Sequence, residues 1–347
     1  METHSHMFDA DLKRILKNVS RTLYLSINIL PAGTRALMAL GYLFCRAFDT
    51  VTDCSGIDHG LKREILELAH NLDDKQSSGK LSEKIKLAGR AIANPRDKEL
   101  LFKFDKLLAV YFELKESDRA LINFACAGVA RGMEMDLETF SGTGVSAFKT
   151  EEELKKYCGY IGGVPGIFWA KLYREAIRHG NIRAVKFPSE QSAFAIGSAL
   201  QITNILKDMC ADLKAGRCYL PQSDLLTKHL LPEDLLNPGN MERLKDTVYK
   251  WISWAVDMLD MSEEFVSSIP KTELAMRAAV IWPVYWAMDT LEQVARANLL
   301  DFSDRPRIKR KRIYSTIVLT PPLLLSNTAF SRGYRFRRET LIVSINK

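Results

Sequence analysis

Two pairs of aspartates in this sequence have the spacing of a metal-binding site. Asp49 and Asp53 are four residues apart, and Asp208 and Asp212 repeat that spacing much later in the chain. On a helix, this spacing places two carboxylates on one face, about 6 Å apart along the axis, where they repel each other. A divalent cation removes the repulsion, and Mg²⁺ prefers oxygen ligands and shares itself with phosphate oxygens. One such pair is often only a solvated turn, but two pairs predict Mg²⁺ sites, with Mn²⁺ as the alternative ion.

The first pair ends a predicted helix that begins after Pro31, a residue suited to a helix start. The charged residues and the tyrosine of this segment are spaced by 7, 4, 3 and 4 residues and therefore share one face of the helix: Arg35, Tyr42, Arg46, Asp49 and Asp53. The rest of the segment is mostly apolar. A narrow polar stripe on an apolar helix is typical of a helix that lines a cavity, and the guanidinium of Arg46 suits a diphosphate.

The second pair lies on a predicted helix that Ser189 is suited to cap and Gly216 to end. Four polar side chains share one side of this otherwise apolar helix: Gln201, Asn204, Asp208 and Asp212. Arg217 follows directly after the helix end. Each acidic pair thus has a basic residue beside it. Two such helices facing each other would hold several Mg²⁺ ions around one or two diphosphates.

The remaining sequence predicts helices almost throughout. Long stretches have the apolar periodicity of helices, 47% of the residues are apolar, and the chain has only 19 Gly and 12 Pro in 347 residues. We expect an all-α fold, with one helical domain over residues 1–312 and a tail, 313–347, whose structure the sequence leaves open. A long loop is expected over residues 73–97, because the sequence Ser77-Ser78-Gly79 punctuates a polar stretch there.

The cysteines and the termini predict a protein of the cytoplasm. None of the six cysteines forms a C-x-x-C pair, so we interpret them as reduced thiols. The N-terminal residues contain no apolar signal core. The longest apolar stretch near the C-terminus, 313–330, is broken by Pro321 and Pro322 and makes a poor transmembrane helix. Peripheral contact with a membrane stays open.

The net charge of +7 is concentrated in the tail. Residues 307–338 contain nine Lys and Arg and no Asp or Glu, and the rest of the chain has 40 basic against 42 acidic residues. This local patch has three interpretations: it neutralises the phosphates of a cofactor, it touches an anionic membrane, or it is a solvated flank. Nucleic-acid binding is disfavoured, since the rest of the chain is net acidic and contains no nucleic-acid-binding motif.

Four motifs resemble the squalene/phytoene synthase family in order and spacing: SRTLYLSINILP, YLFCRAFDTVTD, YCGYIGGVPG and QITNILKDMCADLKAGRCYLP. The resemblance implies a single-domain isoprenoid-synthase bundle of helices around a central cavity, with the two aspartate pairs facing one another as Mg²⁺ ligands. It implies catalytic roles for Tyr42, Arg46 and Tyr157. It also implies contacts to substrate diphosphate from Ser20, Arg21, Arg46, Gln201, Asn204 and Arg217. The stretch RGMEMD resembles a further motif and places Gly132 and Asp136 near the cavity.

The family's members join two C15 or two C20 allylic diphosphates through a cyclopropyl diphosphate. One branch then reduces the product with NADPH to squalene, and the others eliminate a proton to give phytoene or dehydrosqualene. Three stretches favour the squalene-forming branch, acting on farnesyl diphosphate: RAFDTVTD, AAVIWPVYWAMDTLEQV and PRIKRKRIY. Because a similar basic stretch contributes to NADPH binding in that branch, the resemblance implies NADPH contacts from Arg307 and Lys309.

Three points stay open in the sequence. The phytoene- or dehydrosqualene-forming activity is the alternative to squalene formation, whereas a non-catalytic relative is disfavoured because all four aspartates are present. Gly159, Gly162, Gly163 and Gly166 either let a prenyl chain approach a helix or pack two helices closely, and Pro165 is expected to kink their helix. The oligomeric state is not predicted.

Overall fold

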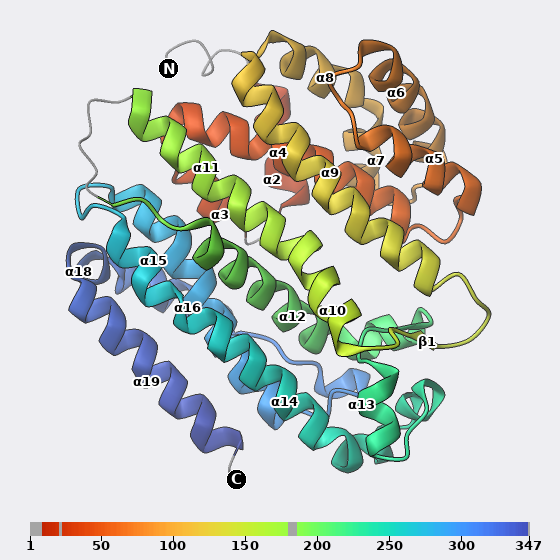
Figure 1. The fold of residues 1–347 in the computed structure, drawn as a ribbon, viewed down its shortest axis with the longest axis vertical. Helices are drawn as coiled ribbons and strands as arrows, with labels where there is room; N and C mark the ends of the chain where they lie inside the picture. Colours follow the sequence, from red (N-terminus) through yellow and green to blue (C-terminus); the bar gives the residue numbers. More distant parts are fainter. Residues whose placement is uncertain (1–8, 21–22, 180–185, 346–347) are drawn as a thin grey trace. The chain divides into compact units, whose positions relative to one another are not determined.

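The computed structural model describes residues 9–20, 23–179 and 186–345 (Figure 1). The all-α prediction is confirmed: the described chain is helical apart from turns, loops and two short strands, β1 (Ser146–Ala147) and β2 (Arg217–Cys218), which pair in parallel. Contacts between residues divide the chain into two compact units. The first comprises Met1–Leu137 and Ile167–Val185, and the second comprises Glu138–Gly166 and Lys186–Lys347.

The helix with the first aspartate pair is the central helix of the first unit. This helix, α4 (Ala32–Asp53), makes its most extensive contacts with α2 (Ala10–Val19), α3 (Leu23–Asn28), α5 (His59–Ala69), α6 (Lys75–Gly89), α7 (Pro95–Phe102) and α8 (Phe104–Glu113). Its apolar side supplies Phe44 and Phe48 to the core, where both rings pack against Phe104. Helix α9 (Glu116–Thr139) and helix α11 (Val164–His179) complete the unit with most of their residues.

The predicted loop over residues 73–97 was wrong, because α6 occupies most of it. Asp74 caps this helix, its carboxylate accepting from the backbone amides of Gln76 and Ser77. Leu81 and Ile85 are then buried four residues apart on one face. The burial of this face outweighs the modest helix propensities of the two serines and Gly79.

The helix with the second aspartate pair has the same central position in the second unit. This helix, α12 (Glu190–Lys214), contacts α10 (Glu151–Cys158), the π-helix η1 (Gly159–Gly163), α14 (Met241–Asp260), α15 (Ser262–Ser268) and α16 (Leu274–Arg296). Its predicted ends are confirmed: the hydroxyl of Ser189 accepts from the amide of Ser192, and Gly216 has a φ of +80° just beyond the helix. Three short helices follow it: α13 (Gln222–Thr227), η2 (Pro232–Leu236) and η3 (Pro238–Asn240).

Glycines let α12 and the preceding segment meet backbone to backbone. A Cβ atom on Gly162 would lie 2.1 Å from the carbonyl oxygen of Gly197, and one on Gly197 would lie 2.1 Å from that of Gly162. A Cβ atom on Gly166 would lie 2.1 Å from the carbonyl oxygen of Ala193. At these positions the packing interpretation of the glycines is therefore correct. The wide π-turn directly before Pro165 also relieves the clash that a proline ring makes with the carbonyl four residues earlier.

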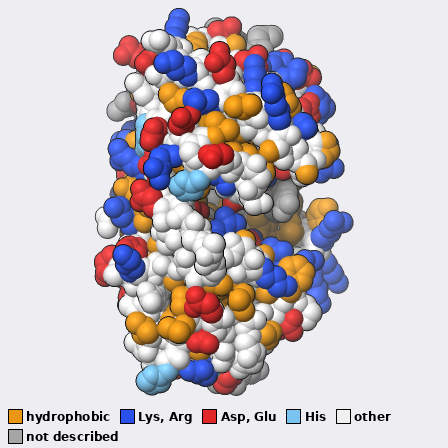
Figure 2. Space-filling model, turned by 90° about the vertical axis from the view of Figure 1, so that its right-hand side faces the viewer, with side chains coloured by type: hydrophobic (Ala, Val, Ile, Leu, Met, Phe, Trp, Pro, Cys, Tyr) orange, Lys and Arg blue, Asp and Glu red, His pale blue; other side chains and the backbone are white. Residues whose placement is uncertain are grey.

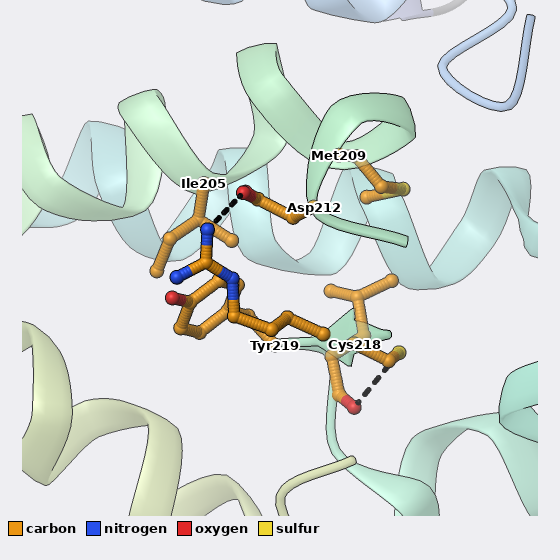
Figure 3. Close-up of a pocket in the computed structure, with 7 residues that line it drawn as sticks. Ile205, Met209, Asp212, Cys218 and Tyr219 are labelled. Carbon is orange, nitrogen blue, oxygen red and sulfur yellow. Dashed lines mark hydrogen bonds and ion pairs between the residues drawn. The ribbon is translucent and has the colours of Figure 1, made fainter. Parts of the chain in front are cut away.

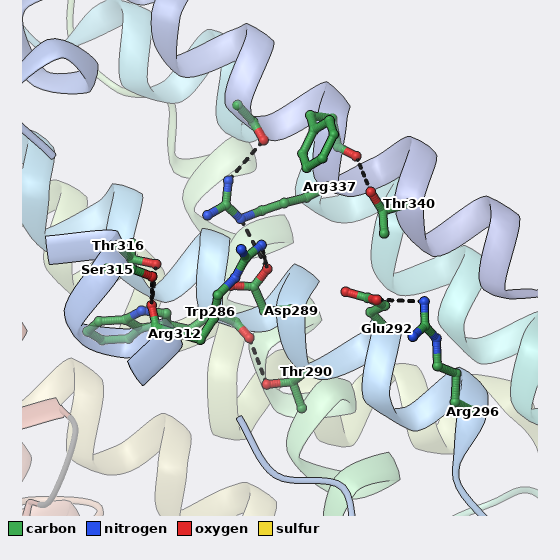
Figure 4. Close-up of polar contacts among 12 residues, drawn as sticks. Trp286, Asp289, Thr290, Glu292, Arg296, Arg312, Ser315, Thr316, Arg337 and Thr340 are labelled. Atoms are coloured by element: carbon green, nitrogen blue, oxygen red, sulfur yellow. Dashed lines mark hydrogen bonds and ion pairs between the residues drawn. The ribbon is translucent and has the colours of Figure 1, made fainter. Parts of the chain in front are cut away.

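The tail also belongs to the second unit and is helical. After η4 (Phe302–Asp304), it forms α17 (Arg310–Val318), α18 (Thr320–Leu325) and α19 (Asn327–Ile345), and α19 packs along α16. The buried carboxylate of Asp289 on α16 accepts from Arg312 at 2.8 and 2.9 Å and from Arg337 at 3.2 Å (Figure 4). The buried guanidinium of Arg277 donates to the carbonyls of Val266 and Ile269 and to Asn327.

One face of the molecule shows how the charges are distributed. On the face in Figure 2, Lys and Arg side chains are interspersed with Asp and Glu and with apolar side chains. Within the described residues, the structure has no helix that is both long and apolar enough to cross a membrane.

Candidate active site

The first aspartate site is the polar stripe of α4. Arg46 forms ion pairs with Asp49, one turn further along the helix, and with Asp97 at the start of α7, at 3.0 Å. Burial lowers the pKa of Arg46, but the two carboxylates outweigh this effect and hold it above its ordinary value. Lys62 donates to the carbonyl of Thr52 at 2.7 Å and so compensates the end of α4, where Asp53 is the last residue. The stripe is partly open to solvent, as a site that admits a ligand requires.

Two further predicted residues lie near this stripe in the first unit. The hydroxyl of Tyr42 donates to the carbonyl of Val19 at 3.2 Å, and the adjacent residue, Ser20, is buried and donates to the carbonyl of Leu16 at 2.5 Å. The structure therefore brings Ser20 close to the α4 stripe. Burial raises the pKa of Tyr42 to about 12, so this phenol keeps its proton at neutral pH. Arg21, also predicted to contact diphosphate, lies outside the described residues.

The second aspartate site lies at the end of α12, in the second unit. Asp212 and Arg217 are 3.7 Å apart, Arg217 being the first residue of β2 (Figure 3). The positive φ of Gly216 turns the chain back on itself, and the pairing of β2 with β1 fixes the direction in which Arg217 leaves the helix. Asp212, Arg217 and Tyr219 line a small pocket of about 10 Å³, which is room for one water molecule at most.

Asp208 has basic partners as well. Lys207 lies 3.3 Å from its carboxylate, and Arg305, which follows η4, forms an ion pair with it. Asn204 accepts from Lys207 at 3.0 Å, and Gln201 lies one helical turn earlier against Gly162. The structure thus places Gln201, Asn204, Asp208 and Asp212 along one helix as predicted. No pattern near Asp208 points to Arg305 as a partner, because Arg305 lies 97 residues away in the chain.

Tyr157 lies beside the second site. Its ring centre is 5.1 Å from that of Tyr219, and the two hydroxyls are 3.5 Å apart. Phe148 packs against both rings, and Phe140 packs against Tyr219. Both tyrosines are buried, so Tyr157 reaches the pocket of Asp212 and Arg217 through Tyr219. Tyr219 was not predicted as a site residue, although it stands two positions after Arg217.

The donor set of the two sites fits Mg²⁺ held together with phosphate. Among the residues that the structure describes, no three His, Cys, Asp or Glu side chains converge on one point. Mg²⁺ is usually held by one or two carboxylates and completes its shell with water and substrate phosphates. The ion pairs of Arg46 with Asp49 and of Arg305 with Asp208 show that a positive charge is already stable at both places.

The remaining predicted residues are less closely tied to these sites. Arg307 and Lys309 are exposed, and neither has an ion-pair partner among the described residues. They are available to bind an anion, as a phosphate of NADPH would require. Gly132 is buried on α9 and Asp136 is half-buried one turn later, both in the first unit. The two aspartate sites lie in different units, and the expectation that they face one another across a cavity stays a prediction.

Each of the two units thus has a central helix with an aspartate pair, and an arginine forms an ion pair with one carboxylate of each pair. The sequence pattern described as squalene/phytoene synthase matches residues 16–313. The chain therefore belongs to the squalene/phytoene synthase family, a family of prenyltransferase-type enzymes.

Named relatives include both activities of the family. The chain is 25% identical over 280 residues to 15-cis-phytoene synthase of Synechocystis, which covers 80% of this chain and 72% of that protein. It is 25% identical over 288 residues to squalene synthase of Schizosaccharomyces pombe, covering 82% and 59%. It is 29% identical over 205 residues to the chloroplastic phytoene synthase of Daucus carota, covering 58% and 46%. The chain thus spans about half to three quarters of these relatives.

Solved structures show the same fold. TcSQS in complex with the ligand E5700 has a TM-score of 0.69 at 18% identity, covering 97% of this chain and 98% of that one. A dehydrosqualene synthase in complex with a ligand has a TM-score of 0.60 at 18% identity, covering 93% and 98%. At these identities the likeness concerns the fold alone.

Proposed function

We propose that this protein is a squalene synthase. It condenses two farnesyl diphosphates head to head through presqualene diphosphate and reduces the product to squalene with NADPH. The observation that carries the proposal is the repeated arrangement on α4 and α12: a carboxylate pair at the end of a central helix, with Arg46 on one pair and Arg217 on the other. Family membership supplies the reaction class for this arrangement.

The carboxylate pairs and the guanidinium groups have separate roles in this proposal. Asp49, Asp53, Asp208 and Asp212 would hold Mg²⁺, which neutralises the negative charge that develops on a departing diphosphate. Arg46 and Arg217 donate hydrogen bonds to diphosphate oxygens. These hydrogen bonds become stronger as negative charge accumulates on the oxygens. Ser20, Gln201 and Asn204 add neutral donors.

The tyrosines act on the other side of the charge separation. Leaving of the diphosphate produces an allylic cation, which a buried aromatic surface stabilises and from which water must be excluded. Tyr157 belongs to such a surface, formed with Tyr219, Phe148 and Phe140. Tyr42 keeps its proton because burial raises its pKa. Its hydroxyl therefore serves as a hydrogen-bond donor and adds no negative charge beside that of the diphosphate.

The reductive step is proposed from the basic segment at the start of the tail. Arg307 and Lys309 are exposed cations without ion-pair partners in the part of the chain that the structure describes, and both suit the phosphates of NADPH. The stretches RAFDTVTD and AAVIWPVYWAMDTLEQV also resemble the squalene-forming branch more than the phytoene-forming one. The squalene synthase of Schizosaccharomyces pombe is among the similar proteins.

The second candidate is a phytoene or dehydrosqualene synthase, which performs the same condensation without a reductant. The similarity to the phytoene synthases of Synechocystis and Daucus carota favours it. This candidate makes no use of Arg307 and Lys309. Substrate length and the requirement for NADPH therefore distinguish the two candidates.

A product assay tests the proposal directly. The purified protein is incubated with farnesyl diphosphate or with its C20 homologue, with Mg²⁺, and with or without NADPH, and the hydrocarbons are identified by mass spectrometry. Squalene that appears only with NADPH is the expected result. A desaturated C30 product made regardless of NADPH, or turnover of the C20 substrate alone, assigns the protein to the second candidate.

Two sets of variants test the residue roles. Asp49→Ala and Asp208→Ala should abolish turnover with helical content unchanged, whereas Asp105→Ala and Asp246→Ala, which remove exposed carboxylates from the same two units, should not. Retained turnover in either of the first two variants contradicts the metal-site assignment.

The double variant Arg307→Ala/Lys309→Ala should raise the KM for NADPH while presqualene diphosphate still forms. Arg332→Ala, which removes an exposed cation from α19, serves as its control. An unchanged KM for NADPH in the double variant removes these two residues from the cofactor site.

A further inference from the structure

Helices α17 and α18 present an apolar face that no other described element covers. Tyr314, Val318, Leu319 and Leu325 are exposed by 64%, 76%, 63% and 60% of their surface, and Pro322 between them is exposed as well. The spacing of Tyr314, Val318, Pro322 and Leu325 is that of one helical face. These five residues are called the α17–α18 face below.

The opposite side of the same helices is packed and fixed. Thr316 and Thr320 are buried, and the hydroxyl of Thr320 accepts from the indole of Trp282 at 2.8 Å. Arg312 binds the buried carboxylate of Asp289 through two hydrogen bonds (Figure 4). The outward direction of the α17–α18 face is therefore set by contacts on its inner side, so it is a permanent feature of the surface.

Two basic side chains lie at one end of the α17–α18 face. Arg310 and Lys311 begin α17, both are exposed, and neither has an ion-pair partner among the residues that the structure describes. The sequence between residues 305 and 338 contains no acidic residue that could neutralise them. By contrast, Arg335 and Arg338 on α19 are paired with Glu263 and Asp260. The unpaired positive charge is thus concentrated beside the apolar face.

We propose that the α17–α18 face docks the protein on an anionic lipid surface. Exposed aliphatic side chains gain free energy by entering the acyl boundary of a bilayer, and neighbouring Lys and Arg gain it from anionic headgroups. Two copies of this chain meeting through the same face would bring their cations together, which disfavours self-association. A nucleic acid would gain little from aliphatic side chains, since single strands bind mainly by stacking on aromatic ones.

This inference goes beyond the proposed reaction, because it concerns where the protein binds and not what it converts. It uses none of the residues assigned to the diphosphate, metal or NADPH sites. A variant of the α17–α18 face should therefore keep its turnover in solution without vesicles. Loss of vesicle binding and loss of turnover can then be observed independently of each other.

The test is sedimentation of the full-length protein with vesicles of phosphatidylcholine alone or mixed with phosphatidylglycerol. Wild type should bind the mixed vesicles more tightly, and salt should weaken the binding. Arg310→Gln/Lys311→Gln should weaken it about 25-fold, from about fivefold for each cation. Val318→Ser/Leu319→Ser should weaken it on the order of 10- to 100-fold. Leu231→Ser/Leu236→Ser, which changes two exposed leucines beside Glu233 and Asp234, should leave it unchanged.

Three results would overturn the proposal. The first is wild type that does not sediment with the mixed vesicles. The second is equal vesicle binding by wild type and Val318→Ser/Leu319→Ser, even where salt still weakens it, since the apolar contact is then absent. The third is a wild-type dimer in light scattering that becomes a monomer in Val318→Ser/Leu319→Ser, because the face is then occupied by a second copy.

Discussion

The contact between Gly162 and Gly197 makes the stability of the second unit depend on the absence of a single methyl group. In Gly197→Ala, the new Cβ atom would lie 2.1 Å from the carbonyl oxygen of Gly162, whereas real Cβ contacts essentially never fall below 3.0 Å. The π-helix η1 and α12 must therefore separate by about 1 Å, because the obstacle is a backbone atom that no rotamer change can move.

The expected cost follows from that displacement. Overpacking of a well-packed interface costs about 1–3 kcal/mol, and a backbone obstacle places this site at the upper end. Alanine returns about 1 kcal/mol of helix propensity, so the net destabilisation of Gly197→Ala is about 2 kcal/mol. Gly79→Ala is the matched control, since Gly79 also lies inside a helix but has nothing within 4 Å of its added Cβ atom. It should be stabilised by about 1 kcal/mol.

Thermal unfolding followed by circular dichroism measures both changes. Gly197→Ala should lower the midpoint by about 4–8 °C and Gly79→Ala should raise it by about 2–4 °C. Gly162→Ala/Gly197→Ala should cost less than the sum of its single changes, because the first methyl already forces the separation that the second needs. A Gly197→Ala variant that melts at or above wild type, with altered substrate affinity instead, would refute the packing argument and restore access of a prenyl chain as the role of these glycines.

Three further predictions rest on single contacts. Arg277→Met should cost about 1–3 kcal/mol in chemical denaturation, because it removes the buried guanidinium from the carbonyl of Ile269 and leaves the carbonyl of Val266 only the amide of Ile269 as a donor. Arg243→Met, which removes an exposed guanidinium from two carbonyls, should cost less than about 1 kcal/mol. Equal costs would contradict the role of burial. Because burial raises the pKa of Tyr42 from 10.0 to about 12, its contribution to stability is complete below pH 10.0 and is lost as the pH rises towards 12. Between pH 10 and pH 12, the free energy of unfolding of Tyr42→Phe should therefore fall less than that of wild type in denaturation curves. An equal fall in both proteins would exclude the raised pKa of Tyr42. Arg305→Gln should tighten binding of Mn²⁺ without diphosphate about two- to fivefold in calorimetric titration, because it removes a competing cation from Asp208; weaker binding would show that Arg305 does not compete.

The long helices were predictable because their signals are local. Pro31 directly precedes α4 and Ser189 caps α12, and the polar spacings within each helix put the aspartates on the predicted face. The same local reasoning failed at α6, where Ser77, Ser78 and Gly79 suggested a break. There the burial of the helix face, which depends on neighbouring helices, decides the structure.

The partners of the site residues were beyond sequence reasoning for a related reason. Asp97 lies 51 residues from Arg46, and Arg305 lies 97 residues from Asp208. Periodicity and capping signals describe residues within a few turns of one another, so they cannot report such pairs. The same limit applies to the tail, whose cations can be counted from the sequence but not divided into paired and unpaired ones. The structure shows that Arg312 and Arg337 bind Asp289, whereas the cations at the start of α17 are exposed.

The second aspartate of each pair lies where the dipole of its own helix disfavours a negative charge. Asp53 is the last residue of α4, and Asp212 lies in the last turn of α12, where the helix dipole disfavours negative charge by about 0.3–1 kcal/mol for each carboxylate. In both units a cation compensates the helix end: Lys62 on the carbonyl of Thr52, and Arg217 beside Asp212. A sequence selected for stability alone would place these carboxylates at the other ends of the helices. Repetition of the same costly arrangement on two unrelated helices is the pattern expected where the carboxylates are needed to hold a cation.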